Sequence, residues 1–376
     1  MRKICLITIA LLKLLSAIAS AQTIDTLLNV NDGCRLHFTI IKGKGDPILF
    51  ESGAGDNGSI WKGITPQIAE ITDATVITYD RLGFGKDSWK SPIGFGNEIK
   101  ALELGLQKLG YANMELLLVS HSMGGMYSSY YASRHPNEVK AAVFIEASTT
   151  CSWSILFKNS AFISKNKNDL NDLNNMLDTV IKYPMPLDIP LIDIVRENSE
   201  PDVDRNTDSI NNYNWFNCHE KFVAQSSKRK SLLAYGCGHG VFLDNPSLVI
   251  NTVVTQYANY VAPEQKAIIF EKAYALTLKT INENNKNELK YGRSEEELNE
   301  WGYFLLGNNE IKKAIEIFKF NVTLNPESWN VYDSLGEAYL KAGEKGLAIK
   351  NYKKSLQLNP KNEHAAEILS QVHKSP

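Results

Sequence analysis

The sequence has no excess of charge of either sign. Its 376 residues include 40 lysines and arginines against 42 aspartates and glutamates, which gives a net charge of −2. Nucleic-acid binding and attachment to anionic membranes both favour a basic surface. The composition therefore supports neither function, and no nucleic-acid partner is expected.

Motifs for common cofactors are also missing. No group of His, Cys, Asp or Glu residues has the spacing of a metal site. The segment GFGKDS at residues 83–88 lacks the frame of a P-loop, and no strand leads into a dinucleotide-binding fingerprint. We therefore expect neither a metal nor another cofactor.

Long hydrophobic runs are confined to the N-terminus. Arg2 and Lys3 precede an apolar stretch at residues 4–18, and the small residues Ala19–Ala21 follow. This order is typical of a secretory signal peptide. The stretch is shorter than the roughly 20 residues that a membrane-spanning helix needs. We predict a signal peptide at 1–21, export to the periplasm or the medium, and no transmembrane span after its removal.

Cysteine is scarce, with five residues in the whole chain. Four would remain after removal of the signal peptide: Cys34, Cys151, Cys218 and Cys237. An even number of cysteines in an exported protein permits disulfides, but the sequence does not choose among the three pairings of four cysteines. Disulfides and unpaired thiols both remain open.

Short apolar runs alternate with amphipathic stretches up to about Val261. This alternation predicts β-strands separated by helices, and hence a mostly parallel sheet with helices on both faces. Asp32-Gly33 between two strand-like segments indicates a hairpin, so the sheet should open antiparallel. The predicted strands are Phe38–Ile41, Pro47–Phe50, Thr75–Tyr79, Leu116–Val119, Ala141–Ile145, Ile189–Val195 and Leu232–Tyr235.

Residues 151–188 differ from the rest of this half. They are rich in Asn and Lys but keep spaced apolar residues. We interpret them as a small helical cap, inserted after a strand and lying over the carboxyl edge of the sheet.

An internal repeat occupies the C-terminal part of the chain. Gly302, Ala314 and Phe318 each have a counterpart 34 residues later, and the sequence LNP at 324–326 recurs at 358–360. Self-similarity at this period is the mark of tetratricopeptide repeats, each a pair of packed helices. The sequence predicts two repeats and the start of a capping helix. Such repeats can bind a protein or peptide partner, or dock on the rest of the chain, and both readings remain open.

The predicted domain boundaries follow from these patterns. Residues 22–262 form an α/β domain, with the cap at about 150–188. Residues 263–295 form a helical linker, and residues 296–376 form the tetratricopeptide-repeat domain.

The segment VSHSMGG at residues 119–125 places a serine between a predicted strand and a predicted helix. A nucleophile elbow has this order, and its sharp turn requires small residues two before and two after the nucleophile. Ser122 meets this requirement with Ser120 and Gly124, whereas Ser120 would place Leu118 at one of these positions. Ser122 is therefore the predicted nucleophile.

VSHSMGGMYSSYYASRHP resembles the elbow of the α/β-hydrolase superfamily, whose members often carry glycine at the position of Ser120. ILFESGAGDNGSIW resembles the oxyanion loop of that superfamily, and VITYDRLGFGKDS its Tyr-Asp-Arg segment after the fourth strand. The resemblance covers about residues 26–261. It implies an α/β-hydrolase fold with a Ser-His-acid triad.

A serine nucleophile needs a base, and His239 is the candidate among seven histidines. It follows the last predicted strand between Gly238 and Gly240, where the superfamily places its histidine. His121 lies inside the elbow and is interpreted as structural, and His219 as part of a polar loop.

The acid of the triad is less well specified. The superfamily uses a carboxylate after the sixth or the seventh strand. Glu146 follows the sixth strand and is favoured, while Glu200 and Asp202 after the seventh are the alternatives. The oxyanion donors implied by the resemblance are the backbone N–H groups of Met123 and Ala54, with Gly53 as an alternative to Ala54.

These features predict an exported serine hydrolase that acts on a small-molecule carboxylic ester or related acyl substrate. An amidase or peptidase of the same fold is one alternative. The other is a binding protein without catalytic activity that uses its tetratricopeptide repeats.

Overall fold

The computed structural model describes residues 22–31, 34–86, 94–158, 167–196, 208–234, 236–287 and 295–374. The predicted signal peptide and the Asp32-Gly33 turn lie outside these residues. None of the described helices is long and apolar enough to cross a membrane.

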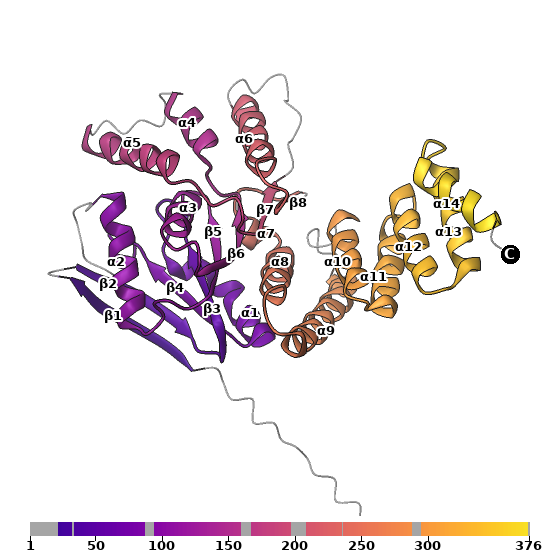
Figure 1. The fold of residues 1–376 in the computed structure, drawn as a ribbon, viewed down its shortest axis with the longest axis horizontal. Coiled ribbons are helices and arrows are strands. Elements are labelled where there is room, and N and C mark those ends of the chain that lie inside the picture. The colour runs from indigo at the N-terminus through magenta and orange to yellow at the C-terminus, as the bar shows by residue number, and fades with distance from the viewer. Residues whose placement is uncertain are drawn as a thin grey trace, which may run out of the picture.

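An eight-stranded sheet forms the centre of the N-terminal half (Figure 1). The strand order is β1-β2-β4-β3-β5-β6-β7-β8; β1 and β2 pair antiparallel, as do β2 and β4, and all later pairs are parallel. The predicted fold class, a mostly parallel sheet that opens antiparallel, is thus confirmed. The strands are β1 (Thr23–Asn31), β2 (Cys34–Ile41), β3 (Gly45–Glu51), β4 (Ala74–Asp80), β5 (Leu116–His121), β6 (Val139–Ile145), β7 (Leu191–Arg196) and β8 (Arg229–Ala234).

Helices cover both faces of this sheet because its central strands are apolar on both sides. Alternate residues of β5 enter opposite cores: Leu117 and Val119 pack on one face, Leu116 and Leu118 on the other. One core includes α1 (Thr65–Thr72) and α8 (Pro246–Ala258), and the other α2 (Phe95–Lys108) and α3 (Gly124–Arg134). The short helices η1 (Gly58–Gly63) and α7 (Val241–Asp244) connect strands to helices.

Three further helices gather at one side of the sheet, at the top of Figure 1. Two of them, α4 (Thr150–Lys158) and α5 (Lys167–Lys182), lie between β6 and β7, within the segment predicted as a helical cap. The third, α6 (Asp208–Val223), lies between β7 and β8. A disulfide between Cys151 and Cys218 joins α4 to α6.

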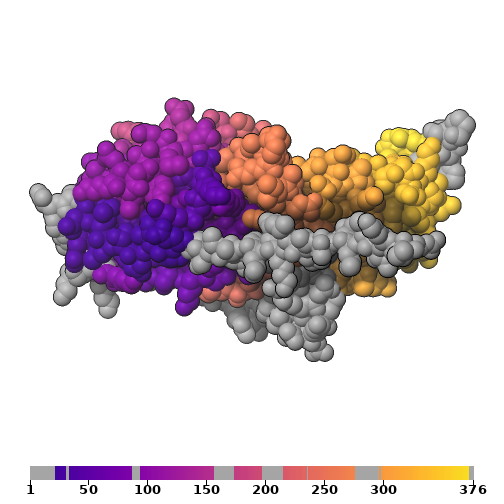
Figure 2. Space-filling model, turned by 90° about the horizontal axis from the view of Figure 1, so that it is seen from below, coloured from indigo at the N-terminus to yellow at the C-terminus, as the bar shows by residue number. Residues whose placement is uncertain are grey.

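The C-terminal part is helical throughout its described residues and extends away from the sheet (Figure 2). α10 packs against α11, and α12 against α13, as two successive helix pairs, with α14 against α13. The helices are α9 (Pro263–Asn287), α10 (Glu295–Gly307), α11 (Ile311–Leu324), α12 (Trp329–Lys341), α13 (Lys345–Leu358) and α14 (Glu363–Lys374).

The repeated residues meet where the two helices of each pair cross. A Cβ on Gly302 would overlap the buried ring of Phe318, and a Cβ on Gly336 would lie 3.2 Å from the ring of Tyr352. Glycine is therefore required for the close approach in the first pair, which explains why the sequence repeats it at this spacing.

α9 joins the two halves. It contacts α1 and α8 of the N-terminal half, and its Phe270 packs edge-to-face on Phe304 of α10 at 4.7 Å. One core continues from the α8 face of the sheet through this helix into the repeats. The helical repeats thus dock on the sheet half through buried apolar side chains.

Candidate active site

Ser122 lies in a strained turn between β5 and α3. Its φ of 52° is in the left-handed region, which residues other than glycine adopt rarely. The turn brings α3 close to β3, because a Cβ on Gly124 would lie 2.6 Å from the carbonyl oxygen of Glu51. A strained serine before a glycine that must be small is the geometry of a nucleophile elbow.

The hydroxyl of Ser120, the other serine of this segment, is buried and already has a hydrogen-bond partner. Ser120 is fully buried, and its hydroxyl is hydrogen-bonded to that of Ser128 on α3 at 2.5 Å. A serine is accommodated at this small-residue position because α3 supplies a partner for the hydroxyl, so the departure from glycine leaves no unsatisfied polar group.

His239 and Glu146, predicted from distant parts of the sequence, meet after β8 and β6. The Nδ1–H of His239 donates to Oε2 of Glu146 at 3.1 Å. Glu146 is completely buried, and its φ of 49° is again left-handed. Because Nδ1 is used by the carboxylate, Nε2 of the neutral imidazole is left as a proton acceptor.

Glu146 is held ionised by its neighbours. Its burial alone would raise its pKa, but the hydrogen bonds from His239 and from the Arg196 N–H, at 2.8 Å, outweigh this effect. Together with the Arg196 charge, with Nε 3.4 Å from Oε2, they hold the pKa of Glu146 below its usual value. The buried carboxylate can therefore orient the His239 imidazole and stabilise its positive charge.

His121 connects the elbow to the loop of His239. Its Nε2–H donates to the backbone oxygen of His239 at 3.0 Å, and the two rings lie 4.7 Å apart. Burial, together with the nearby His239, lowers the pKa of His121 to about 4. His121 therefore stays neutral near pH 7 and holds the backbone of His239 beside Ser122.

The predicted oxyanion donors lie on either side of Ser122. A Cβ on Gly53 would lie 3.2 Å from the Ser122 Cβ, so the loop that carries Ala54 passes directly beside the serine. Met123 is the N-cap residue of α3, at the end of the helix where the N–H groups lack intrahelical partners and the helix dipole favours negative charge. Both predicted donors therefore belong to segments that adjoin Ser122, and their role in binding an oxyanion stays a prediction.

Family models match two parts of the chain. The model described as alpha/beta hydrolase fold matches residues 46–179, and the model described as tetratricopeptide repeat matches residues 329–362. The chain carries an alpha/beta hydrolase domain followed by a tetratricopeptide-repeat region.

Curated proteins are similar over part of the chain. The uncharacterized protein YqjL of Bacillus subtilis is 32% identical over 118 residues, which are 31% of this chain and 45% of that protein. Lipase LipV of Mycobacterium tuberculosis is 28% identical over 99 residues, which are 26% of this chain and 36% of LipV. The chain thus spans less than half the length of these relatives.

Solved structures align with part of the chain at low identity. The haloalkane dehalogenase DatA from Agrobacterium tumefaciens C58 aligns with a TM-score of 0.46 and 13% identity, covering 64% of this chain and 98% of DatA. The esterase EaEST from Exiguobacterium antarcticum aligns with a TM-score of 0.45 and 15% identity, covering 62% of this chain and 99% of the esterase.

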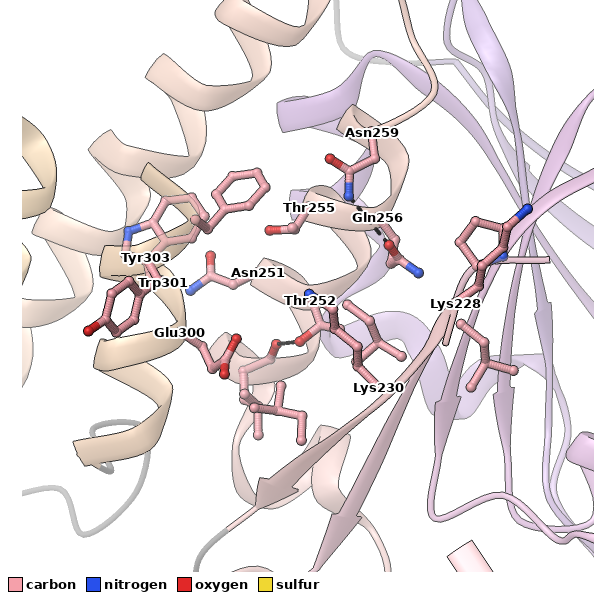
Figure 3. A pocket seen from close by; sticks show the side chains of 16 residues that line it. Lys228, Lys230, Asn251, Thr252, Thr255, Gln256, Asn259, Glu300, Trp301 and Tyr303 are labelled. Carbon is pink, nitrogen blue, oxygen red and sulfur yellow. Dashed lines mark hydrogen bonds between the residues drawn. The ribbon is translucent and has the colours of Figure 1, made fainter. Parts of the chain in front are cut away.

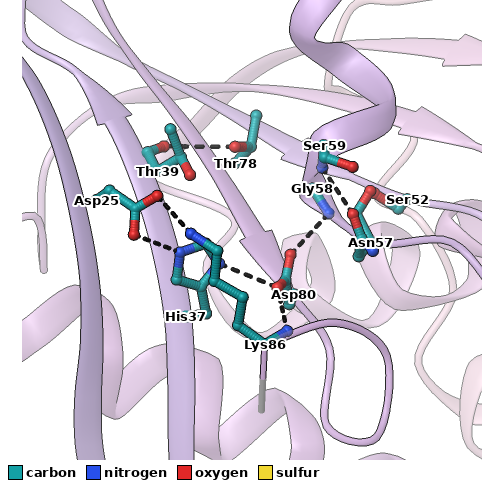
Figure 4. A network of polar contacts seen from close by, with 10 residues as sticks. All are labelled: Asp25, His37, Thr39, Ser52, Asn57, Gly58, Ser59, Thr78, Asp80 and Lys86. Atoms are coloured by element: carbon teal, nitrogen blue, oxygen red, sulfur yellow. Dashed lines mark hydrogen bonds and ion pairs between the residues drawn. The ribbon is translucent and has the colours of Figure 1, made fainter.

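A buried polar network supports the oxyanion loop of the hydrolase domain (Figure 4). One oxygen of Asp80 accepts the N–H of Gly58 at 3.0 Å; the other accepts from Nδ1 of His37 and from the N–H of Lys86, each at 3.0 Å. Arg81 forms an ion pair with Glu51 and donates to the carbonyl oxygens of Ser52 and Gly53. Asp80 and Arg81 thus fix the backbone of the predicted oxyanion loop.

Two points of the predicted triad remain predictions. Glu200 and Asp202, the alternative acids, lie outside the described residues. Among the described residues, no hydrogen bond joins the Ser122 hydroxyl to His239. Catalytic hydrogen bonds of this kind are often long in the absence of substrate, so this geometry leaves the assignment of the two residues as a prediction.

The interpretation of His219 as a loop residue was wrong. It lies on α6, almost completely buried, with its Nδ1 2.7 Å from Oδ2 of Asp193 on β7. Trp215, one turn earlier, packs near His239, and no sequence motif indicated it. The spacing of Trp215, His219 and Phe222, four and then three residues, could have indicated an inward-facing helix side.

A separate cavity of about 390 Å³ lies between the hydrolase domain and the repeats (Figure 3). Residues of β7, β8, α8 and α10 line it, among them Lys230, Asn251, Gln256 and Trp301. It shares no residue with the cluster around Ser122 and is therefore separate from the candidate active site.

Proposed function

We propose that this protein is an exported serine hydrolase that cleaves a small carboxylic ester through an acyl-enzyme on Ser122. The observation that carries the proposal is the hydrogen bond between His239 and the buried Glu146, 3.1 Å long, beside a serine in a strained elbow. Relatives that carry lipase names, from Mycobacterium tuberculosis and Bos taurus, support an ester as the substrate class.

The first half of the reaction forms the acyl-enzyme. Nε2 of His239 takes the proton of the Ser122 hydroxyl as the serine oxygen attacks the ester carbonyl. The new imidazolium is stabilised by the carboxylate of Glu146, which stays ionised. His239 then gives its proton to the departing alcohol oxygen as the ester C–O bond breaks.

The second half releases the acid. His239 removes a proton from a water molecule, which attacks the acyl carbonyl, and returns the proton to Ser122 as the enzyme is regenerated. In both halves the negative charge develops on the carbonyl oxygen, where the N–H groups of Met123 and Ala54 donate. One such donor contributes about 3 kcal/mol of transition-state stabilisation in serine hydrolases.

Export is part of the same proposal. The N-terminal sequence has the order of a signal peptide, and the Cys151–Cys218 disulfide supports an oxidising compartment, because such bonds persist there and are rare in the cytosol. We further propose that the tetratricopeptide repeats offer a surface to a protein or peptide partner.

The test is a substrate panel with the mature protein. We expect rapid release of p-nitrophenol from short acyl esters, with a burst equal to one acyl group per chain. Cleavage of the matched anilides but not of the esters would indicate an amidase. Absence of turnover on both panels would favour the binding-protein alternative and contradict the proposal.

A further inference from the structure

One face of α6 is fixed to the hydrolase domain at successive turns. Phe222 stacks on Phe144 of β6 at 5.7 Å with the rings nearly parallel, and its carbonyl oxygen accepts from Arg229 of β8 at 2.9 Å. His219, on the same side one turn earlier, bonds to Asp193 of β7. α6 is thus attached to three adjacent strands of the sheet.

The His219–Asp193 pair is an unusual anchor for a helix. The side chains of both residues are at most 1% exposed, and burying such a pair is costly unless its geometry is good. Burial alone would lower the pKa of His219, but the interaction with Asp193 raises it, whereas burial raises the pKa of Asp193, so the contact that defines the pair is its hydrogen bond. A hydrogen bond of 2.7 Å at this position fixes both the rotation and the height of α6 over the sheet.

A covalent link adds to this attachment. Cys218, next to His219, forms the disulfide with Cys151 of α4. It closes a loop that spans 67 residues of sequence and ties the two helices on that side of the sheet. The link and the buried pair therefore act on the same turn of α6.

Trp215 lies one turn before His219 on α6 and packs near His239. Its ring centroid lies 5.8 Å from that of His239, with the planes at 74°, and 5.0 Å from that of His219. His239 contacts His121 as well, at 4.7 Å. The His239 side chain is 44% exposed, and within the part of the chain that the structure describes its ring contacts are with Trp215 and His121.

We propose that Trp215 is a positioning residue for His239, and that the His219–Asp193 pair and the Cys151–Cys218 disulfide hold it in place through α6. The inference rests on the proposed serine-hydrolase function. The indole keeps the imidazole in the orientation in which Nε2 faces Ser122, whereas Glu146 fixes the other nitrogen. Edge-to-face ring pairs of this kind contribute modestly, so loss of the indole should slow the reaction about five- to tenfold.

The first experiment compares Trp215→Leu and Trp215→Phe in the full chain, with Trp329→Leu as the matched control. Trp329 is an exposed tryptophan on α12 in the repeats. We expect W215L to lower kcat for a p-nitrophenyl ester about five- to tenfold with KM unchanged, W215F to restore most of the loss, and W329L to behave as wild type. Wild-type kcat in W215L, or a loss confined to KM, would overturn the proposal.

The second experiment tests whether the disulfide acts through Trp215. The double variant C151S/C218S is combined with W215L in a double-mutant cycle. We expect the disulfide variant to lower kcat in the wild-type background and to have little further effect once Trp215 is absent. Fully additive losses would overturn the proposed connection. Failure of the wild-type protein to hydrolyse any ester would contradict the proposed function instead, so the two failures are distinguishable.

Discussion

Ser122 and Glu146 share a backbone conformation that is rare for residues other than glycine. Their φ angles are 52° and 49°. Such strain costs on the order of 1–3 kcal/mol per residue and persists where the surroundings enforce it. Here both residues directly follow adjacent parallel strands, β5 and β6. The strain supports a shared role for the two residues.

The assignment of the acid leads to the first prediction. Glu146→Gln should lower kcat for a short ester roughly 10³- to 10⁴-fold, because the neutral amide cannot stabilise the imidazolium and can favour the wrong tautomer. Asp202→Asn and Glu200→Gln are the controls and should leave kcat within about twofold of wild type. Loss of activity in D202N with an active E146Q would transfer the role to Asp202.

Measurements of stability and of activity should distinguish the roles of the two serines in the elbow. Ser120→Ala removes the partner of the Ser128 hydroxyl, so it should lower the free energy of unfolding by about 1–2 kcal/mol while ester hydrolysis continues. Denaturant unfolding and steady-state kinetics check the two parts. An S120A protein of normal stability but without activity would contradict the structural role of Ser120.

Among the helices and strands, those with a regular spacing of apolar residues or a repeated motif could be predicted from the sequence. The apolar runs matched seven strands because their side chains face cores on both sides of the sheet. The repeated glycines lie at helix crossings, because an aromatic ring of the partner helix packs against each of them. α6 was harder to predict because its inward face combines Trp215 and Cys218 with the polar His219, so that its helical spacing is not a purely hydrophobic pattern.

Acid stability should depend on an ion-pair cluster between α2 and α3. Glu103 accepts from Nε of Arg134 at 2.6 Å and from Nε2 of His135 at 2.9 Å. Partial burial alone would raise the pKa of Glu103, but these hydrogen bonds outweigh it and lower the pKa to about 2. The hydrogen bond to Glu103 in turn raises the pKa of His135.

The sign of each shift sets a pH window. The Glu103 contribution is present above pH 4.5, its unfolded value, and is lost as the pH falls towards 2. The His135 contribution is full below about pH 6.5 and fades as the pH rises through its raised pKa. Glu103→Gln should therefore lower the free energy of unfolding by about 1–2 kcal/mol at pH 5.5, after allowance for solvent screening, and by much less at pH 2.5. An equal loss at both pH values would contradict this account.

The two repeat glycines should differ in their tolerance of a methyl group. Alanine in a helix interior usually adds up to about 1 kcal/mol of stability over glycine. At Gly302 the overlap with the buried Phe318 ring should reverse this gain, so that G302A loses about 1–3 kcal/mol. G336A, with 3.2 Å to Tyr352, should lose less than about 1 kcal/mol. Equal thermal stability of the two variants would contradict the close crossing in the first repeat.

At the scale of the whole molecule, the hydrolase domain and the repeats share one continuous core through α9. The sequence left open whether the repeats dock on the hydrolase domain, because packing between distant segments has no local signature. Docking and partner binding are compatible, since α9 contacts the hydrolase domain while the later helices extend away from it (Figure 1).

The meeting of His239 and Glu146 is likewise a property of the whole molecule. Sequence motifs indicated the serine and the histidine. Only the fold places Glu146, after β6, next to His239, after β8. The carboxylate was chosen from several along the chain, and its burial and partners had no signal in the sequence.

The central claim is that Ser122 is a nucleophile activated by His239, and covalent labelling tests it most directly. The full-length protein is treated with a fluorophosphonate probe, and the modified peptide is identified by mass spectrometry, with S120A, S122A and H239A in parallel. The account predicts one label on Ser122 in wild type and S120A, none in S122A, and a labelling rate at least about 10³-fold lower in H239A. A label that persists in S122A, or that lies on another residue, would contradict it.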